Sequence, residues 1–254
     1  MDFSSKQRWS ITKLATYQIL PGVVSLAIFI PALLLVRDTG LPRMAALFIA
    51  ILLGETPMSW YLMIRTLREE GKTLSVESLF PWRAKIGKAK IFLLGLPLAI
   101  VSMMIVFGLS MAFETPIREA FFSWVPEWMV LVAGPEGMAG SSQLGLILLW
   151  ILSGAVGVLI GGFTQELYAR GFLLPRAAHL GWKAVPLNAL FFAMLHVAAP
   201  WGWPFFFLAS LIWGAVVYKW KSVQLGLAGH IGMLAIGWLM MTLVVFGLVP
   251  PMSP

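Results

Sequence analysis

Three segments of the sequence place polar, potentially reactive side chains inside long apolar runs. The first contains Gln165, Glu166 and Arg170, and the other two contain His196 and His230. An ionisable residue within a membrane-length apolar segment is costly; it usually faces a protein-lined cavity and often carries function. A carboxylate and two imidazoles can activate water, either directly or through a bound divalent metal such as zinc. We therefore take Gln165, Glu166, His196 and His230 as candidate catalytic residues, with Arg170 as structural support. Glu166, His196 and His230 are also candidate metal ligands.

Each of these residues also has a purely structural interpretation. Glu166 and Arg170 are four residues apart, so on a helix they can form an ordinary ion pair. A single His in an apolar helix can be a hydrogen-bonded packing residue. The three segments taken together favour a shared cavity, because costly polar sites rarely accumulate in neighbouring membrane elements without one.

The composition predicts an integral membrane protein. Of the 254 residues, 59% are hydrophobic and only 11% are charged, and the mean hydropathy is +0.88. Soluble domains have about a quarter charged residues. The chain contains no Cys, which excludes disulfides, Cys nucleophiles and thiolate metal sites.

We expect an all-α bundle of about seven transmembrane helices, because several apolar stretches reach the length that a bilayer requires. The first stretch is too long for a cleavable signal segment and is interpreted as a retained span. The expected spans are 14–36, 44–64, 91–113, 144–174, 184–199, 204–219 and 222–249.

The positive charges indicate how these spans are oriented. Of the 18 Lys and Arg residues, only Arg37, Arg43 and Arg118 fall on the side opposite the others. The positive-inside rule therefore predicts a cytoplasmic N-terminus. The basic residues follow the membrane rather than forming a separate domain, so we expect a lipid bilayer and no nucleic acid as partner. The topology is typical of a multi-pass protein of the bacterial inner (plasma) membrane.

The same charges give an expected depth for the reactive residues. If Arg170 marks the inner end of its span, Gln165 and Glu166 lie about one helical turn inside it. His230 follows Lys221 by nine residues, roughly 14 Å along a helix. These residues are thus expected to meet in the inner half of the bundle.

Glu55 is a second acid inside an apolar span, within the sequence Gly-Glu-Thr-Pro. It is interpreted either as a proton or substrate contact or as a hydrogen-bonded or protonated packing residue. Glycines such as Gly154, Gly157, Gly161 and Gly162 predict close helix packing. We expect one membrane domain over residues 1–254, with variable spans and loops at 1–143 and a motif-bearing helical core at 144–249.

The motif-bearing segments resemble a known family. Glu166 and Arg170 with the residues around them, then Phe192 followed by His196, then His230, have the order and spacing of the CPBP membrane proteases. These are also called Abi proteins or type II CAAX prenyl endopeptidases. The family pattern is Glu-Glu-x-x-x-Arg, Phe-x-x-x-His and His-x-x-x-Asn. The resemblance covers about residues 161–238.

The resemblance implies roles for these residues. In the family, the first Glu and the His of the second motif activate water, and the His and Asn of the third motif stabilise the oxyanion; participation of a metal is open. This sequence departs at two positions: Gln165 replaces the first Glu and Leu234 replaces the Asn. A neutral amide has no titratable proton near pH 7, and loss of one oxyanion donor costs about 10² to 10³ in rate.

Three functions are compatible with the sequence. The first is an intramembrane endopeptidase that cleaves a membrane-embedded or lipidated peptide, by Glu/His-dependent or metal-assisted hydrolysis. The second is a catalytically impaired protease fold that acts as a scaffold, immunity factor or subunit of a membrane complex. The third is an ion or small-molecule carrier that uses Glu55. The sequence, however, lacks the paired discontinuous helices that are typical of carriers.

Overall fold

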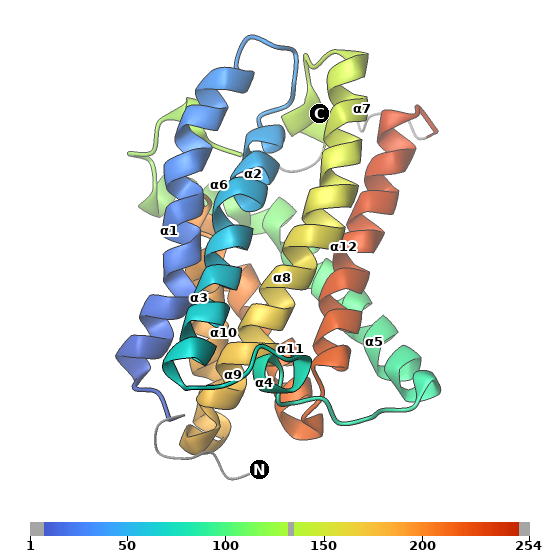
Figure 1. Cartoon of the computed structure of the whole chain (residues 1–254). Helices are drawn as coiled ribbons and strands as arrows, with labels where there is room; N and C mark the ends of the chain where they lie inside the picture. Colours follow the sequence, from blue (N-terminus) through green and yellow to red (C-terminus); the bar gives the residue numbers. More distant parts are fainter. Residues whose placement is uncertain (1–7, 132–134, 249–254) are drawn as a thin grey trace.

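The computed structural model describes residues 8–131 and 135–248, and this part of the chain is all-α. Six of its helices are long and apolar enough to cross a membrane (Figure 1). They are Ile11–Val36, Met44–Glu69, Lys88–Phe121, Gln143–Arg176, Pro200–Trp220 and Val223–Val245. The predicted multi-pass helical membrane fold is therefore confirmed, and contact with a lipid bilayer follows from it. Lys6 and Val249, which entered the predicted topology, lie outside the described residues.

Both of the first two spans contain prolines, and the second span widens next to its proline. Helix α1 (Ile11–Val36) begins where the Ser10 side chain accepts a hydrogen bond from the Lys13 N–H, and it contains two prolines. The second span consists of α2 (Met44–Ala50), the π-helical η2 (Ile51–Glu55) and α3 (Thr56–Glu69). Pro57 lies at the start of α3. Because proline lacks an N–H and its ring crowds the carbonyl four residues earlier, the wider turn of η2 is the adjustment that a helix needs there.

The third span is longer than the sequence predicted. Short helix α4 (Val76–Leu79) precedes it, and α5 (Lys88–Met103), η3 (Met104–Leu109) and α6 (Ser110–Phe121) then form one continuous helix. The predicted end of this span at residue 113 is wrong, because the helix continues to Phe121 and the Glu114 carboxylate accepts a hydrogen bond from Trp201 Nε1 at 2.7 Å. Two 3₁₀ turns, η4 (Glu127–Met129) and η5 (Pro135–Met138), lie before the fourth span.

The fourth span is long and repeatedly widened. It runs through α7 (Gln143–Leu152), η6 (Ser153–Gly162), α8 (Phe163–Glu166), η7 (Leu167–Leu173) and α9 (Leu174–Arg176), with η6 and η7 π-helical. Its glycines allow the close packing that the sequence predicted. A Cβ atom at Gly154 would lie 2.8 Å from Trp238, and one at Gly162 would lie 2.6 Å from Leu234. The widened turns and small residues bring this span close to α12.

The predicted span 184–199 is helical over only part of its length. After the 3₁₀ segment η8 (Ala178–Lys183), helix α10 (Ala184–Leu195) has 12 residues, about 18 Å. This is too short to cross a hydrocarbon core of about 30 Å. The chain turns at His196, passes through η9 (Pro200–Gly202) and returns in α11 (Trp203–Trp220). Non-helical backbone within a membrane requires cover by protein or water, so the turn at His196 needs the surrounding helices.

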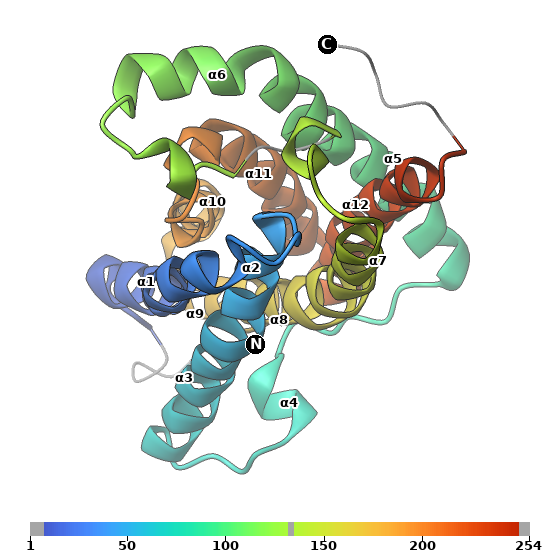
Figure 2. The same ribbon diagram turned by 90° about the horizontal axis from the view of Figure 1, so that it is seen from above.

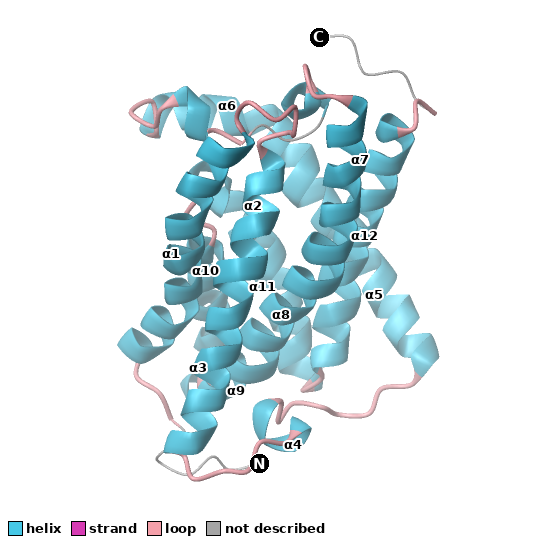
Figure 3. Cartoon of the chain, turned by 45° about the horizontal axis from the view of Figure 1, so that its top comes forward, coloured by secondary structure: helices cyan, strands magenta, loops and turns pink. Residues whose placement is uncertain are grey.

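The surrounding helices provide this cover. Most loops lie at the two ends of the bundle (Figure 3). Seen along the bundle, α10 and α11 lie between α1 on one side and α6 on the other (Figure 2). The last helix, α12 (Val223–Val245), packs along α5 and also contacts α8 and η7. The motif-bearing helices are thus in contact with the N-terminal spans.

Candidate functional site

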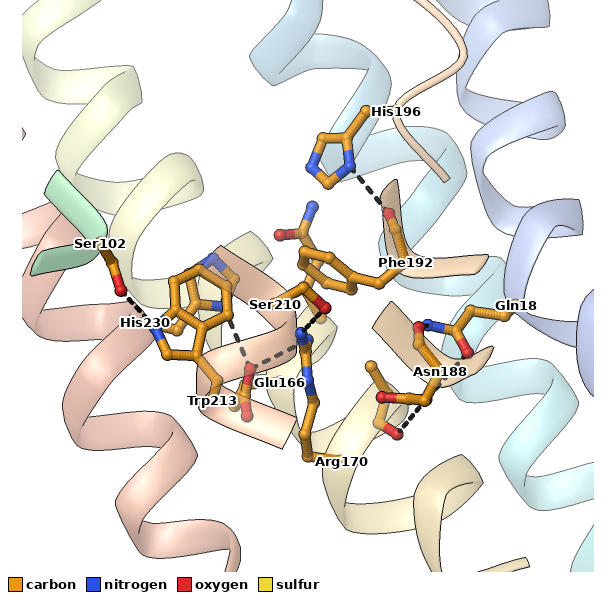
Figure 4. A network of polar contacts seen from close by, with 12 residues as sticks. Gln18, Ser102, Glu166, Arg170, Asn188, Phe192, His196, Ser210, Trp213 and His230 are labelled. Atoms are coloured by element: carbon orange, nitrogen blue, oxygen red, sulfur yellow. Dashed lines mark hydrogen bonds and ion pairs between the residues drawn. The ribbon is translucent and has the colours of Figure 1, made fainter. Parts of the chain in front are cut away.

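Glu166 is the centre of a buried ion-pair cluster. Its Oε2 atom lies 3.1 Å from Arg170 Nη1 and 3.3 Å from His230 Nδ1 (Figure 4). The side chains of Glu166 and Arg170 are both fully buried, and His230 is 3% exposed. A charge buried this deeply is tolerated when it is paired. The cluster therefore joins α8 and η7 to α12 within the bundle.

Gly226 on α12 makes room for this carboxylate. A Cβ atom at this position would overlap with Glu166 Oε1 and approach its carboxyl carbon at 2.9 Å. Any larger residue at 226 would have to displace the carboxylate. The absence of a side chain at Gly226 is thus required for the contact between Glu166 and His230.

Arg170 lies deeper in the protein than the sequence predicted. The helix continues past it to Arg176, so the expectation that Arg170 marks the inner end of the span is wrong. Its guanidinium bonds to the Ser210 hydroxyl and lies 4.0 Å from the centroid of the Phe192 ring and 5.3 Å from that of Trp213. The carboxylate and the aromatic faces together replace the water that a surface Arg would have.

His230 is held from two sides. One face stacks on the Trp213 ring at a centroid distance of 4.5 Å, and the Trp213 Nε1–H donates to Ser102 Oγ at 2.7 Å. Its Nδ1 atom faces Glu166, and because a carboxylate can only accept, the proton of the ring is placed on Nδ1. The ring stacking and the 3.3 Å contact with Glu166 together orient the His230 ring.

His196 lies in the turn after α10 and belongs to a separate contact set. Its Nδ1 lies 3.0 Å from the Phe192 carbonyl oxygen, and its ring stacks on Phe206 at 4.2 Å. A carbonyl only accepts hydrogen bonds, so Nδ1 carries the proton and Nε2 keeps a free lone pair. Trp203 Nε1 donates to the His196 carbonyl at 3.1 Å and holds the turn in place. Unlike His230, His196 as a whole residue is partly exposed.

The two candidate histidines share the Phe192 ring as a neighbour. Its centroid is 5.2 Å from that of His196 and 5.8 Å from that of His230. In Figure 4, His196 lies apart from the cluster formed by Glu166, Arg170 and His230. Within residues 8–131 and 135–248, no group of three His, Cys, Asp or Glu side chains is placed to hold a metal ion. The candidate metal ligands therefore do not fit a three-ligand site.

Gln165 points away from its neighbour Glu166 and contacts a different helix. Its Nε2 donates to Glu55 Oε1 at 2.7 Å, and both side chains are buried, at 9% and 6% exposed. Adjacent helical residues point about 100° apart, so the two consecutive polar residues serve separate contacts. The partner of Glu55, which the sequence left open, is therefore Gln165.

A third polar contact set, not predicted from the sequence, lies beside the cluster. Gln18 on α1 and Asn188 on α10 bond to each other at 3.0 Å, and Asn188 also donates to the Ala169 carbonyl at 3.1 Å. Ser102 and Ser210 were missed as well. Their signal in the sequence is only that of single small polar residues in apolar helices, which usually bond to nearby backbone.

The order of the site residues along the chain agrees with one family model. Residues 143–236 match the model described as type II CAAX prenyl endopeptidase Rce1-like. This range includes Gln165, Glu166, Arg170, His196 and His230. No curated protein and no solved structure gives a significant match to the chain. The chain thus carries, at residues 143–236, a domain of the Rce1-like type II CAAX prenyl endopeptidase (CPBP) family.

Proposed function

We propose that this membrane protein hydrolyses peptide bonds, with His196 as the group that takes the proton from the attacking water. The observation that carries the proposal is the hydrogen bond between His196 Nδ1 and the Phe192 carbonyl, at 3.0 Å. This bond leaves Nε2 as a proton acceptor. His196 is partly exposed whereas Glu166 and His230 are enclosed, so His196 is the candidate base that water can reach.

The reaction that follows is a general acid–base hydrolysis. A water molecule gives one proton to His196 Nε2 while its oxygen bonds to the carbonyl carbon of the scissile peptide. The imidazolium then gives this proton to the departing amide nitrogen, and the C–N bond breaks. The products are a carboxylate and an amine. A positioned general base of this kind contributes about 10² to 10⁴ in rate.

The buried cluster has a supporting role in this proposal. Glu166 and Arg170 hold each other, and Glu166 orients the ring of His230 through Nδ1. With its ring proton on Nδ1 facing Glu166, His230 can donate to a developing oxyanion through Nε2 only as the imidazolium, whose positive charge the Glu166 carboxylate would stabilise. Leu234 offers no hydrogen bond, so we expect a slow enzyme, because one missing donor costs about 10² to 10³ in rate.

The position of His196 indicates the class of substrate. The residue follows a helix of about 18 Å and lies in the turn between α10 and α11, two helices that pack against each other, with α10 also packed against α1. A scissile bond that reaches it must enter the bundle. We therefore propose a membrane-embedded or lipidated peptide as substrate. Because no three donor side chains of the described residues are grouped, the proposed reaction contains no step at a metal.

A second function is favoured by a different observation. Gln165 is bonded to Glu55 and cannot titrate, Leu234 is apolar and packs near Gly162, and Glu166 is fully enclosed. A protease fold with these features could bind a membrane partner without cleaving it, as a scaffold, immunity factor or subunit of a complex. In that case the polar contacts would serve stability alone.

A cleavage assay separates the two functions. Purified protein in lipid vesicles is incubated with transmembrane and lipidated peptides, and products are identified by mass spectrometry. We expect cleavage by the wild type and its loss in His196→Ala. The matched control is His179→Ala, because His179 lies in η8, where its Nδ1 contacts the Arg176 carbonyl at 3.2 Å. Equal cleavage by wild type and His196→Ala, or none by the wild type, would contradict the proposal.

A further inference from the structure

Glu55 is a buried acid whose surroundings differ from those of Glu166. Its carboxylate is 6% exposed and accepts one hydrogen bond, from Gln165 Nε2 at 2.7 Å. Within the described part of the chain, no Lys, Arg or His forms an ion pair with it. A carboxylate can accept about four hydrogen bonds, and burying one without a cation is costly. Stability alone therefore gives little reason to keep an acid at this position.

Glu55 lies at the widened turn that precedes Pro57 in the second span. Glu55 is the last residue of the widened turn η2, directly before the start of α3. Such π-helical insertions occur frequently at functional sites. A second side-chain bond, from Trp60 Nε1 to Thr164 Oγ1 at 3.3 Å, joins the same two helices next to the Glu55–Gln165 bond. The relative register of α3 and α8 is thus set by two bonds, one of which holds the carboxylate.

The residues that precede Glu55 and His196 in the chain, Gly54 and Leu195, pack on the same part of α1. A Cβ atom at Gly54 would lie 3.1 Å from the Ser25 Cα, and one at Gly22 would overlap with the Leu195 carbonyl. Gly22 and Ser25 are three residues apart on α1, about 4.5 Å along the axis. The residue before Glu55 and the residue before His196 therefore both pack on one turn of α1.

We infer that the Glu55 carboxylate binds and orients the attacking water together with His196, and that Gln165 is the residue that positions this carboxylate. The inference rests on the proposed hydrolysis. Glu55 accepts a hydrogen bond from one O–H of the water while His196 Nε2 takes the proton of the other. The Glu55 carboxyl group neither gains nor loses a proton in this step, and the proton returns from His196 to the leaving nitrogen, so no further reactant is needed. Glu55 thereby supplies the carboxylate that Gln165, a neutral amide, cannot provide.

The competing interpretation is that Glu55 is a packing residue. A neutral Glu or a Gln would then maintain the contact with Gln165 equally well. Glu55→Gln separates the two roles, because it keeps the size and the hydrogen-bonding capacity of the side chain but removes the negative charge. The double variant Glu55→Gln/Gln165→Glu exchanges acid and amide across the same hydrogen bond and leaves the overall composition of the pair unchanged.

The test measures kcat and KM for these variants with a peptide that the wild type cleaves. We expect Glu55→Gln to lower kcat by about 10²-fold with little change in KM, as for loss of a group that acts on the reacting water. The exchange variant should have a kcat at least about tenfold higher than that of Glu55→Gln, because it again places one carboxylate in the pair. The matched control is Glu114→Gln, because Glu114 also accepts one bond from a neutral side chain, Trp201, at 2.7 Å; we expect it to retain wild-type kcat.

Thermal unfolding in detergent accompanies each kinetic measurement, and Glu55→Asp serves as a further variant. Aspartate keeps the carboxylate, but its shorter side chain places the charge farther from Gln165. We therefore expect Glu55→Asp to have a kcat between those of the wild type and Glu55→Gln. Wild-type kcat in folded Glu55→Gln, or an exchange variant no better than Glu55→Gln, would overturn this inference while His196-dependent cleavage still stood. Absence of cleavage by the wild type would overturn the proposed hydrolysis and this inference with it.

Discussion

Gln165 donates its side-chain N–H to Glu55 over 2.7 Å, and this bond connects the fourth span of the bundle to the second. The next residue, Glu166, turns instead toward Arg170 and His230. The two adjacent polar residues therefore belong to different contact sets. The amide that replaces an acid in the family pattern has an acid from another helix as its partner.

This relationship gives a prediction for Gln165→Glu. The variant places two carboxylates side by side, and like charges at this distance cannot both ionise, so one takes up a proton. Leu234 also leaves the oxyanion short of one donor. We therefore expect kcat no higher than that of the wild type in the peptide assay. A large increase in turnover by this single variant would contradict the assignment of Glu55 and the importance of Leu234.

A second prediction concerns the stability of the buried ion pair. Arg170→Met should lower the free energy of unfolding by about 3 to 5 kcal/mol, because it leaves Glu166 as an uncompensated buried charge. The double variant Glu166→Gln/Arg170→Met should lose less than the two single variants combined. The measurement is denaturant unfolding in mixed micelles.

The chain contains a matched control for this experiment. Arg65 and Glu69 form another i,i+4 pair at 2.7 Å, but their side chains are 54% and 46% exposed. Arg65→Met should leave the free energy of unfolding close to that of the wild type, because exposed ion pairs contribute little to stability. Equal effects at Arg65 and Arg170 would show that the buried cluster does not have the energetic role assigned to it.

A third prediction tests the space reserved for the Glu166 carboxylate. Gly226→Ala places a methyl group against Oε1 of Glu166. We expect a loss of about 1 to 3 kcal/mol in stability from overpacking, together with lower cleavage activity because His230 loses its partner. Gly108→Ala is the control, since no atom outside its own helix lies within 4 Å of a Cβ at that position. If Gly226→Ala behaves like Gly108→Ala in unfolding and cleavage measurements, the close contact has no role.

The sequence predicted the membrane fold and most span positions, because apolar length and charge placement reflect the bilayer directly. It did not predict that α10 ends at Leu195. The apolar run continues to Ala199, and hydropathy cannot distinguish a helix from a turn that neighbouring helices enclose. The extension of α6 past Glu114 was missed for a similar reason, since its partner Trp201 is distant in sequence.

For the candidate site, the sequence predicted one contact between its residues and missed most of the others. The contact of Glu166 with Arg170 follows from helical spacing, as expected. The hydrogen bond from Gln165 to Glu55 joins residues that are 110 positions apart in the sequence. No local sequence pattern predicts this pairing. The depth expected for Arg170 was wrong because its charge is neutralised inside the bundle rather than by water at the membrane surface.

The central claim is that this protein adds water to a peptide bond through His196. It is tested most directly by cleaving a peptide in H₂¹⁸O with wild-type protein, His196→Ala and His179→Ala in vesicles, followed by mass spectrometry of the products. The account predicts one ¹⁸O atom in the new C-terminal carboxylate for the wild type and for His179→Ala, and no labelled product for His196→Ala. Labelled product from His196→Ala at the wild-type rate, or none from the wild type, would contradict it.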